Sequence, residues 1–174
     1  MGSPEPARGM RRAESEITSR ASLDSILRKA RVLFLALRDG EAPYVVPLCF
    51  GYETDTLYVH SALSGTKIDL IRAHPAVGFS ACTDVILIPG AAACDFGLSA
   101  QSVAGTGKAR ILANGTEGAR GLDLIMRHYA EGEAAEAPVY RPGSLSRTCV
   151  IAIHIESLRG RQLGQPGHVV PPSL

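Results

Sequence analysis

The stretch that most constrains this chain is Tyr58–Arg72, YVHSALSGTKIDLIR, which predicts a strand, a turn of small residues and then a helix. The first turn of a helix leaves backbone N–H groups unpaired, and the helix dipole places partial positive charge there. Ser61, Ser64 and Thr66 add hydroxyl groups. Lys67 adds a full positive charge, which the dipole disfavours unless an anion faces it. The pattern favours an anion site; the alternative is an ordinary helix capped by Ser64, with Lys67 in solvent.

The composition narrows the possible classes of protein. The chain has 174 residues, 45% hydrophobic and 20% charged, as in one globular domain of ordinary size. A formal charge of +1 gives no reason to expect a nucleic acid or an acidic membrane as partner, and the 5% aromatic content with no Trp argues against a surface that stacks bases. No apolar run approaches the roughly 18 residues that cross a bilayer. The N-terminus lacks the apolar core of a secretion signal, so we expect a cytoplasmic protein.

The four cysteines do not predict a metal site or a disulfide framework. Cys49, Cys82, Cys94 and Cys149 are far apart in the sequence and form no CxxC pair. Each lies beside apolar residues, so we expect reduced thiols that pack as small hydrophobic side chains, and no metal.

The periodicity of the chain predicts a mainly β member of the α+β class. Residues 1–20 show no apolar period and are expected to form a flexible arm; residues 21–160 form the domain, and 161–174 a C-terminal tail. Short helices are predicted near residues 22–30, 66–73 and 114–129, and residues 89–99 are predicted to be a loop. Strands are predicted over residues 31–38, 43–53, 56–62, 76–88, 101–112 and 148–160.

Three local features bear on how these strands meet. The first strand is apolar on both faces, which predicts burial on both sides, and Asp39-Gly40 predicts a hairpin after it. Pro47 cannot donate to a ladder, so it belongs at an edge or at a bulge that closes a barrel. Gly105 and Gly107 strip one face of their strand, which suits a bend or the close approach of another backbone or a flat ligand.

The order of these elements resembles the FMN-binding split barrel, and the chain is most similar to the nitroimidazole-resistance (Nim) branch of the pyridoxamine 5'-phosphate oxidase-like proteins. The resemblance covers about residues 20–160. Its most specific motif is His-Ser/Thr-x-x-x-Gly-x-Lys/Arg at residues 60–67, followed by SV-x-x-x-G-x-AR at residues 102–110. Neither a Walker loop nor a Rossmann fingerprint is present in the sequence.

The resemblance implies a homodimer of six-stranded antiparallel split β-barrels with flanking short helices, and FMN held in clefts between the subunits. Ser61 and Lys67 would hold the FMN phosphate, with help from the backbone of the turn. His60 would lie near the flavin ring, where related proteins carry a histidine associated with activity. The other implied contacts are Ala62, Ser64, Gly65 and Thr66 in the turn, Val46, Pro47 and Leu48 along the ring edge, and Gln101 and Ser102, expected to approach from the other subunit.

The implied activity is that of an FMN-dependent oxidoreductase or reductase of small organic molecules, such as a nitroreductase, with NAD(P)H binding only transiently in an open cleft. His60 suits proton donation; the alternative is a structural histidine that bonds a neighbour. Ala100-Gln101 stands where the family often has an aromatic residue, and Gly105 replaces a larger apolar one, so we expect a roomier cleft. The alternative functions are a flavin-binding or redox-sensing protein without turnover, and a haem-binding relative.

Overall fold

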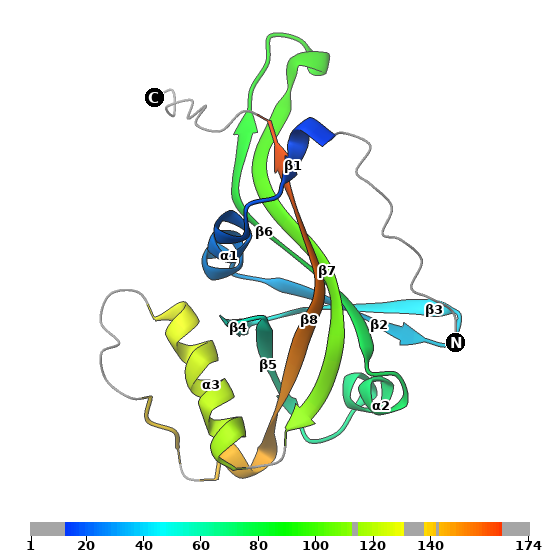
Figure 1. Cartoon of the computed structure of the whole chain (residues 1–174), viewed down its shortest axis with the longest axis vertical. Helices are drawn as coiled ribbons and strands as arrows, with labels where there is room; N and C mark the ends of the chain where they lie inside the picture. Colours follow the sequence, from blue (N-terminus) through cyan, green and yellow to red (C-terminus); the bar gives the residue numbers. More distant parts are fainter. Residues whose placement is uncertain (1–12, 113–114, 131–137, 142, 165–174) are drawn as a thin grey trace.

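The computed structural model of the chain describes residues 13–112, 115–130, 138–141 and 143–164 (Figure 1). The helices are α1 (Arg20–Lys29), α2 (Thr66–Ala73) and α3 (Thr116–Tyr129). The strands are β1 (Glu16–Ile17), β2 (Leu33–Asp39), β3 (Ala42–Leu48), β4 (Phe50–Glu53), β5 (Thr56–Ala62), β6 (Ala76–Ile88), β7 (Gly97–Leu112) and β8 (Thr148–Leu163). All the pairings are antiparallel, which confirms the prediction of a mainly β, α+β fold.

The strand order shows why the sheet is a barrel that does not fully close. The order is β3-β2-β6-β7-β8-β5-β4, with β1 added beside β8. β3 and β4 therefore stand at opposite ends of the order, yet only Cys49 separates them in the chain. Since residues two apart lie within about 7 Å, the sheet must curl until its ends meet. No ladder joins these two strands in the described part of the chain, so the barrel stays split at this point.

The core fills the inside of the curled sheet. Side chains that alternate along the strands point inward, and α1 and α2 add apolar side chains to them. The largest fully buried side chains come from these elements: Phe50, Ile26, Leu27, Leu33, Leu35, Leu57, Ile68, Ile151, Ile153, Val59 and Val103.

Burial of the first strand on both faces, as predicted from its apolar pattern, is wrong. Leu33 and Leu35 are fully buried, but Phe34, on the outer face of β2, is 41% exposed. The reason is the placement of α3, which packs on β4, β5 and β8 and leaves the outer face of β2 uncovered by any described element. For the same reason Val150 and Ala152, on the outer face of β8, are buried.

The hairpin and proline predictions are confirmed. Gly40 begins the two-residue turn between β2 and β3 with a positive φ of 58°, which glycine adopts without strain. Pro47 lies on β3 opposite Phe34, and β3 is an end strand of the order, where a missing N–H costs no ladder bond.

The glycines of β7 mark both a bend and a close backbone approach. A Cβ at Gly105 would lie 2.2 Å from the Ser157 carbonyl oxygen, and one at Gly107 would lie 2.3 Å from the His154 carbonyl oxygen. Between Thr106 and Gly107 the register with β8 shifts by one residue. Such a bulge bends the strand, so β7 and β8 can wrap around the core.

Several predicted boundaries differ from the structure, because the pairing of distant strands decides them. The strand expected over residues 43–53 is two strands, which break at Cys49, and residues 97–99 extend β7 rather than form a loop. Part of the expected flexible arm, residues 13–20, forms a 3-10 turn, β1 and the start of α1. β8 continues to Leu163, into the expected tail. The sheet therefore has eight strands instead of six; residues 1–12 and 165–174 lie outside the described residues.

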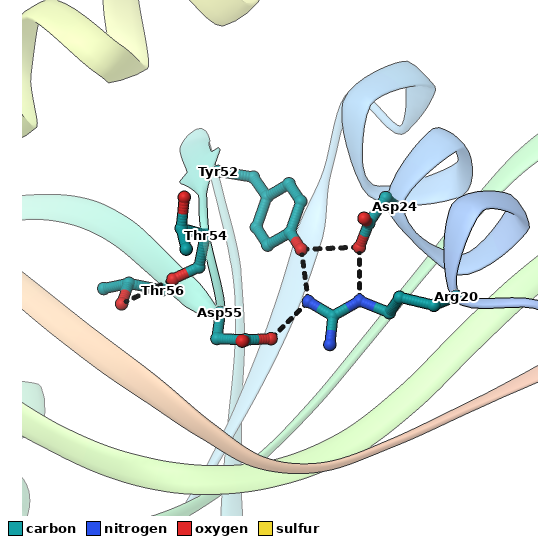
Figure 2. Close-up of polar contacts among 6 residues, drawn as sticks. All are labelled: Arg20, Asp24, Tyr52, Thr54, Asp55 and Thr56. Atoms are coloured by element: carbon teal, nitrogen blue, oxygen red, sulfur yellow. Dashed lines mark hydrogen bonds and ion pairs between the residues drawn. The ribbon is translucent and has the colours of Figure 1, made fainter.

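A polar cluster fastens α1 to the turn between β4 and β5 (Figure 2). The Arg20 guanidinium donates to the Asp24 carboxylate at 2.7 Å and to the Tyr52 hydroxyl at 2.9 Å, and it also pairs with Asp55. Tyr52 in turn donates to Asp24 at 2.7 Å. Burial raises the pKa of the Asp24 carboxyl, but the hydrogen bonds from Tyr52 and Arg20 lower it more, so the pKa lies below its usual value. The cluster fixes the end of β5 that lies away from α2.

Candidate anion and cofactor site

The candidate site lies where the barrel is split. β4 pairs with β5 only as far as Phe50 and Val59, so among the described residues β8 is the one strand that pairs with residues 60–62 of β5. β3 comes directly before Cys49 in the chain, and its outer edge has no strand partner among the described residues. We call this region, bounded by residues 46–48 and 60–62, the split. Because only Cys49 lies between Leu48 and Phe50, and Phe50 pairs with Val59, the end of β3 that carries the predicted residues Val46, Pro47 and Leu48 leads into the strand that pairs beside His60.

The helix that follows has an uncapped N-terminus. Gly65 is its N-cap residue, with φ of 119°, and the N–H groups of Ile68 and Asp69 both donate to the Gly65 carbonyl, at 2.9 and 3.1 Å. No described side chain caps the helix, so the alternative with Ser64 as N-cap is wrong. The position of a Cβ on Gly65 has no atom within 4 Å. The N–H groups of Thr66 and Lys67 donate to no acceptor among the described residues, so they are left for an anion.

Lys67 stands in the first turn of this helix without a counter-ion. The chain has three lysines: Lys29 pairs with Asp84 at 3.6 Å and Lys108 with Glu156 at 3.2 Å. No carboxylate of the described residues pairs with Lys67, which is half-buried. Burial lowers the pKa of Lys67. A bound anion would supply the partner that this ammonium group lacks.

Cys149 is the residue of this region that the sequence did not reveal. It is 4% exposed, pairs across the ladder with Ser61, and its thiol donates to the Ala62 carbonyl oxygen at 3.2 Å. Burial raises the pKa of the thiol, while Lys67 and Arg72 lower it less. At neutral pH the thiol is therefore protonated and leaves the charge of Lys67 unbalanced. Only the register of β5 with β8 places Cys149 here, and no local pattern signals it.

The structure does not bring the His60 and Ser61 side chains together. Successive residues of a strand point to opposite faces. Ser61 shares its face with buried Val59, on the side of the core and α2, whereas His60 shares its face with Tyr58 and is exposed. Figure 1 shows α2 and α3 on opposite sides of β5 and β8. The imidazole ring of His60 makes no hydrogen bond to any described residue.

A hollow of about 290 Å³ lies on the side of the sheet that His60 faces. Thr148 and Val150 of β8 line it, and their ladder partners on β5 are Ala62 and His60; His60 itself is not part of the lining. The rest of its lining is small or apolar and comes largely from α3: Gly115, Gly118, Ala119, Leu122, Leu145 and Ser146.

Gln101 and Ser102 lie far from the split within one chain. Gln101 pairs with Gln162 on β8, and their amides are hydrogen-bonded at 3.1 Å. His60 pairs with Val150, twelve residues earlier on β8. At about 3.3 Å per residue the two positions are roughly 40 Å apart along the strand. One copy of the chain therefore cannot bring Gln101 and His60 to the same small ligand.

Two further observations concern the described residues alone. No three His, Cys, Asp or Glu side chains among them gather where they could hold a metal ion. In the same part of the chain, no helix has both the length and the apolar character that crossing a membrane requires.

Comparison with known proteins identifies the family. The model of the pyridoxamine 5'-phosphate oxidase family (Pyridox_ox_2) matches residues 19–162. A structure from Bacteroides thetaiotaomicron, assigned provisionally to 5-nitroimidazole antibiotic resistance, is 29% identical with a TM-score of 0.73; the match covers 86% of this chain and 87% of that one. A FAD-binding protein from Mesorhizobium loti is 26% identical with a TM-score of 0.58, and the match covers 84% and 96% of the two chains.

A further comparison shows similarity of fold alone. The flavocytochrome Anf3 from Azotobacter vinelandii is 18% identical with a TM-score of 0.76, and the match covers 91% of this chain and 73% of that one. No curated protein matches the chain.

The resemblance inferred from residues 60–67 and 102–110 is confirmed. Since the family model spans residues 19–162, the chain belongs to the pyridoxamine 5'-phosphate oxidase family of split-barrel, flavin-binding proteins.

Proposed function

We propose that this protein binds FMN and acts as a flavin-dependent oxidoreductase that reduces small organic molecules, as a Nim-like nitroreductase does. The observation that carries the proposal is the uncapped start of α2, which has Lys67 in its first turn without a carboxylate partner among the described residues. A phosphate monoester fits this donor set, because it offers several acceptor oxygens and a charge opposite to that of Lys67. Family membership supports a flavin as the bearer of that phosphate.

Each part of the split has a role in this proposal. Lys67 and the first N–H groups of α2 bind the phosphate, and the Ser61 hydroxyl adds a hydrogen bond from the face that points toward α2. Val46, Pro47 and Leu48 line the ring edge from β3; β3 has no strand partner on its outer side in the described chain, so its backbone groups there are available to the ring. FMN, when bound, supplies hydride or single-electron transfer. NAD(P)H is the proposed electron donor, and it binds only transiently.

The proposal includes a homodimer with FMN at the subunit interface. Gln101 and Ser102 lie roughly 40 Å along β8 from the position of His60, so they can contact the same FMN only from a second subunit. Sedimentation of the purified protein measures the mass directly. A monomer at micromolar concentration with FMN bound would contradict the subunit arrangement but not the flavin.

His60 is the proposed proton donor to a reduced substrate. Its ladder partner Val150 lines the hollow between α3 and β8, which has room for a small apolar molecule. Because His60 is exposed and its ring makes no described hydrogen bond, His60→Ala should change the free energy of unfolding by less than about 0.5 kcal/mol. Turnover should fall about 100-fold or more if His60 is the general acid. Unchanged turnover with flavin retained would remove His60 from the mechanism.

A second candidate function is flavin binding without turnover, as in a carrier or redox sensor. It is favoured by the lack of any described partner that orients the His60 ring, since general acids are usually held by one. The two functions differ in one measurement. An enzyme whose bound flavin is bleached by NADH or NADPH should regain its colour when a nitro compound is added, many times per flavin, whereas a carrier should not.

The absorption spectrum of the protein as purified tests the central proposal. Flavin bands that persist through gel filtration, with a flavin released by heat that co-elutes with FMN standard, are the expected result. Release of FAD instead would support flavin binding but would change the proposed cofactor from FMN to FAD. A colourless protein that takes up no FMN in excess would contradict the proposal, and a Soret band would indicate haem.

A further inference from the structure

The turn that leads to α2 is held at its start by a buried thiol. Cys149 of β8 is 4% exposed, and its S–H donates to the carbonyl oxygen of Ala62 at 3.2 Å. Ala62 is the last residue of β5, and the last pair of the β5–β8 ladder joins it to Thr148. Three residues later the backbone reaches Gly65, the N-cap of α2. The hydrogen bond thus fixes the point from which the turn leaves the sheet.

The same thiol lies beside the segment that leads to Lys67: Cys149 pairs with Ser61 across the ladder, and Lys67 follows Ala62 by five residues. Burial raises the pKa of the thiol more than Lys67 lowers it, which keeps the thiol neutral and able to donate near pH 7. A neutral donor suits this position better than a carboxylate, because an acidic side chain here would pair with Lys67 and repel an incoming phosphate.

We propose that Cys149 is a positioning residue of the phosphate site: through Ala62 it fixes the point at which residues 63–66 leave β5, and with it the position of the start of α2, which favours FMN over riboflavin. The inference rests on the proposed function. Cys149 contacts neither the phosphate nor the ring, and acts only on the turn. Its effect should therefore appear for ligands that carry the phosphate and be absent for those that lack it.

The decisive experiment compares two ligands on four proteins. The dissociation constants of FMN and riboflavin are measured by flavin fluorescence for the wild type, Cys149→Ala, Cys149→Ser and the control Cys94→Ala. Cys94 is exposed, in the connection between β6 and β7, and so lies outside the site. Loss of one hydrogen bond predicts about 3- to 10-fold weaker FMN binding by Cys149→Ala, with riboflavin unchanged. Serine keeps a donor, so Cys149→Ser should restore most of the preference.

Two results would overturn the inference. One is a Cys149→Ala protein with the FMN and riboflavin affinities of the wild type. The other is an equal loss for both ligands that tracks a lower melting temperature, which would show that the thiol only packs the core.

A second readout needs no flavin and separates this inference from the proposed function. Inorganic phosphate is titrated into the proteins while the backbone amide shifts of residues 64–68 are followed by NMR. The wild type should bind phosphate more tightly than Cys149→Ala, and Cys149→Ser should lie between them. A wild type that binds phosphate but no flavin would contradict the proposed function and leave the role of Cys149 standing. Equal phosphate binding by wild type and Cys149→Ala would contradict the role of Cys149.

Discussion

Replacing Lys67 by alanine separates a binding role from a structural one, because the two predict opposite effects on the protein without ligand. Lys67 is half-buried and has no carboxylate partner among the described residues. In the FMN complex its ammonium group would make a charge-assisted hydrogen bond to the phosphate. Loss of such a bond costs about 1 to 3 kcal/mol, which corresponds to about 5- to 150-fold weaker FMN binding.

Without ligand, the same substitution should not destabilise the protein. Burial lowers the pKa of Lys67 in the folded state, so the folded protein holds this proton less tightly than the unfolded chain does. While the ammonium group is charged, the folded protein bears the cost of burying it, and this cost diminishes as the pH rises through the lowered pKa. Alanine removes the cost. We therefore expect an unchanged or higher melting temperature for the ligand-free variant.

The assay uses Lys108→Ala as a matched control, since Lys108 is exposed and already paired with Glu156. FMN affinity is measured by fluorescence quenching, and the free energy of unfolding by urea denaturation of the ligand-free proteins. Lys108→Ala should leave FMN binding unchanged. FMN affinity of Lys67→Ala equal to that of the wild type would refute the anion site. A loss of more than about 1 kcal/mol in the ligand-free protein would show that Lys67 supports the fold instead.

Two further predictions concern the scaffold. Gly105→Ala should lower the free energy of unfolding by at least about 2 kcal/mol in urea denaturation, because its Cβ would meet the Ser157 carbonyl oxygen at 2.2 Å. The control Gly78→Ala, whose Cβ would make only ordinary contacts, should change the free energy of unfolding by less than about 1 kcal/mol. Equal losses in the two variants would contradict the close approach at Gly105. The His128 ring donates to the Ala30 carbonyl at 2.7 Å, and burial lowers its pKa below 6.5. The stability that neutral His128 contributes should be complete above about pH 6.5 and should be lost as the pH falls through the lowered pKa. The melting temperature should therefore fall more steeply with decreasing pH in the wild type than in His128→Gln. Parallel pH profiles of the two proteins would contradict this prediction.

The strands and helices followed closely from residues near one another in the sequence. β5 spans Thr56–Ala62, as the alternation of TLYVHSA predicts, and α2 ends at Ala73, just before His74-Pro75. The turn at Gly40 and the edge position of Pro47 were also predictable, because backbone torsion and the missing N–H are properties of single residues.

Burial and face could not be predicted in the same way. The two apolar faces of β2 look alike in sequence, but only one meets the core, because α3 covers other strands. Similarly, β4 looks like a continuation of β3 in sequence, yet the two stand at opposite ends of the sheet. Closure of the sheet depends on pairings between residues far apart in the chain, and no local pattern encodes them.

The sequence by itself determined the candidate anion site, since a strand, a small-residue turn and a lysine in the first turn of a helix are all local features. Only the tertiary structure decided what surrounds that site. The register of β5 with β8 placed Cys149 opposite Ser61, and the register of β7 with β8 kept Gln101 far from His60. Register is fixed by packing a whole sheet around one core, so it becomes known only when every strand has its partner.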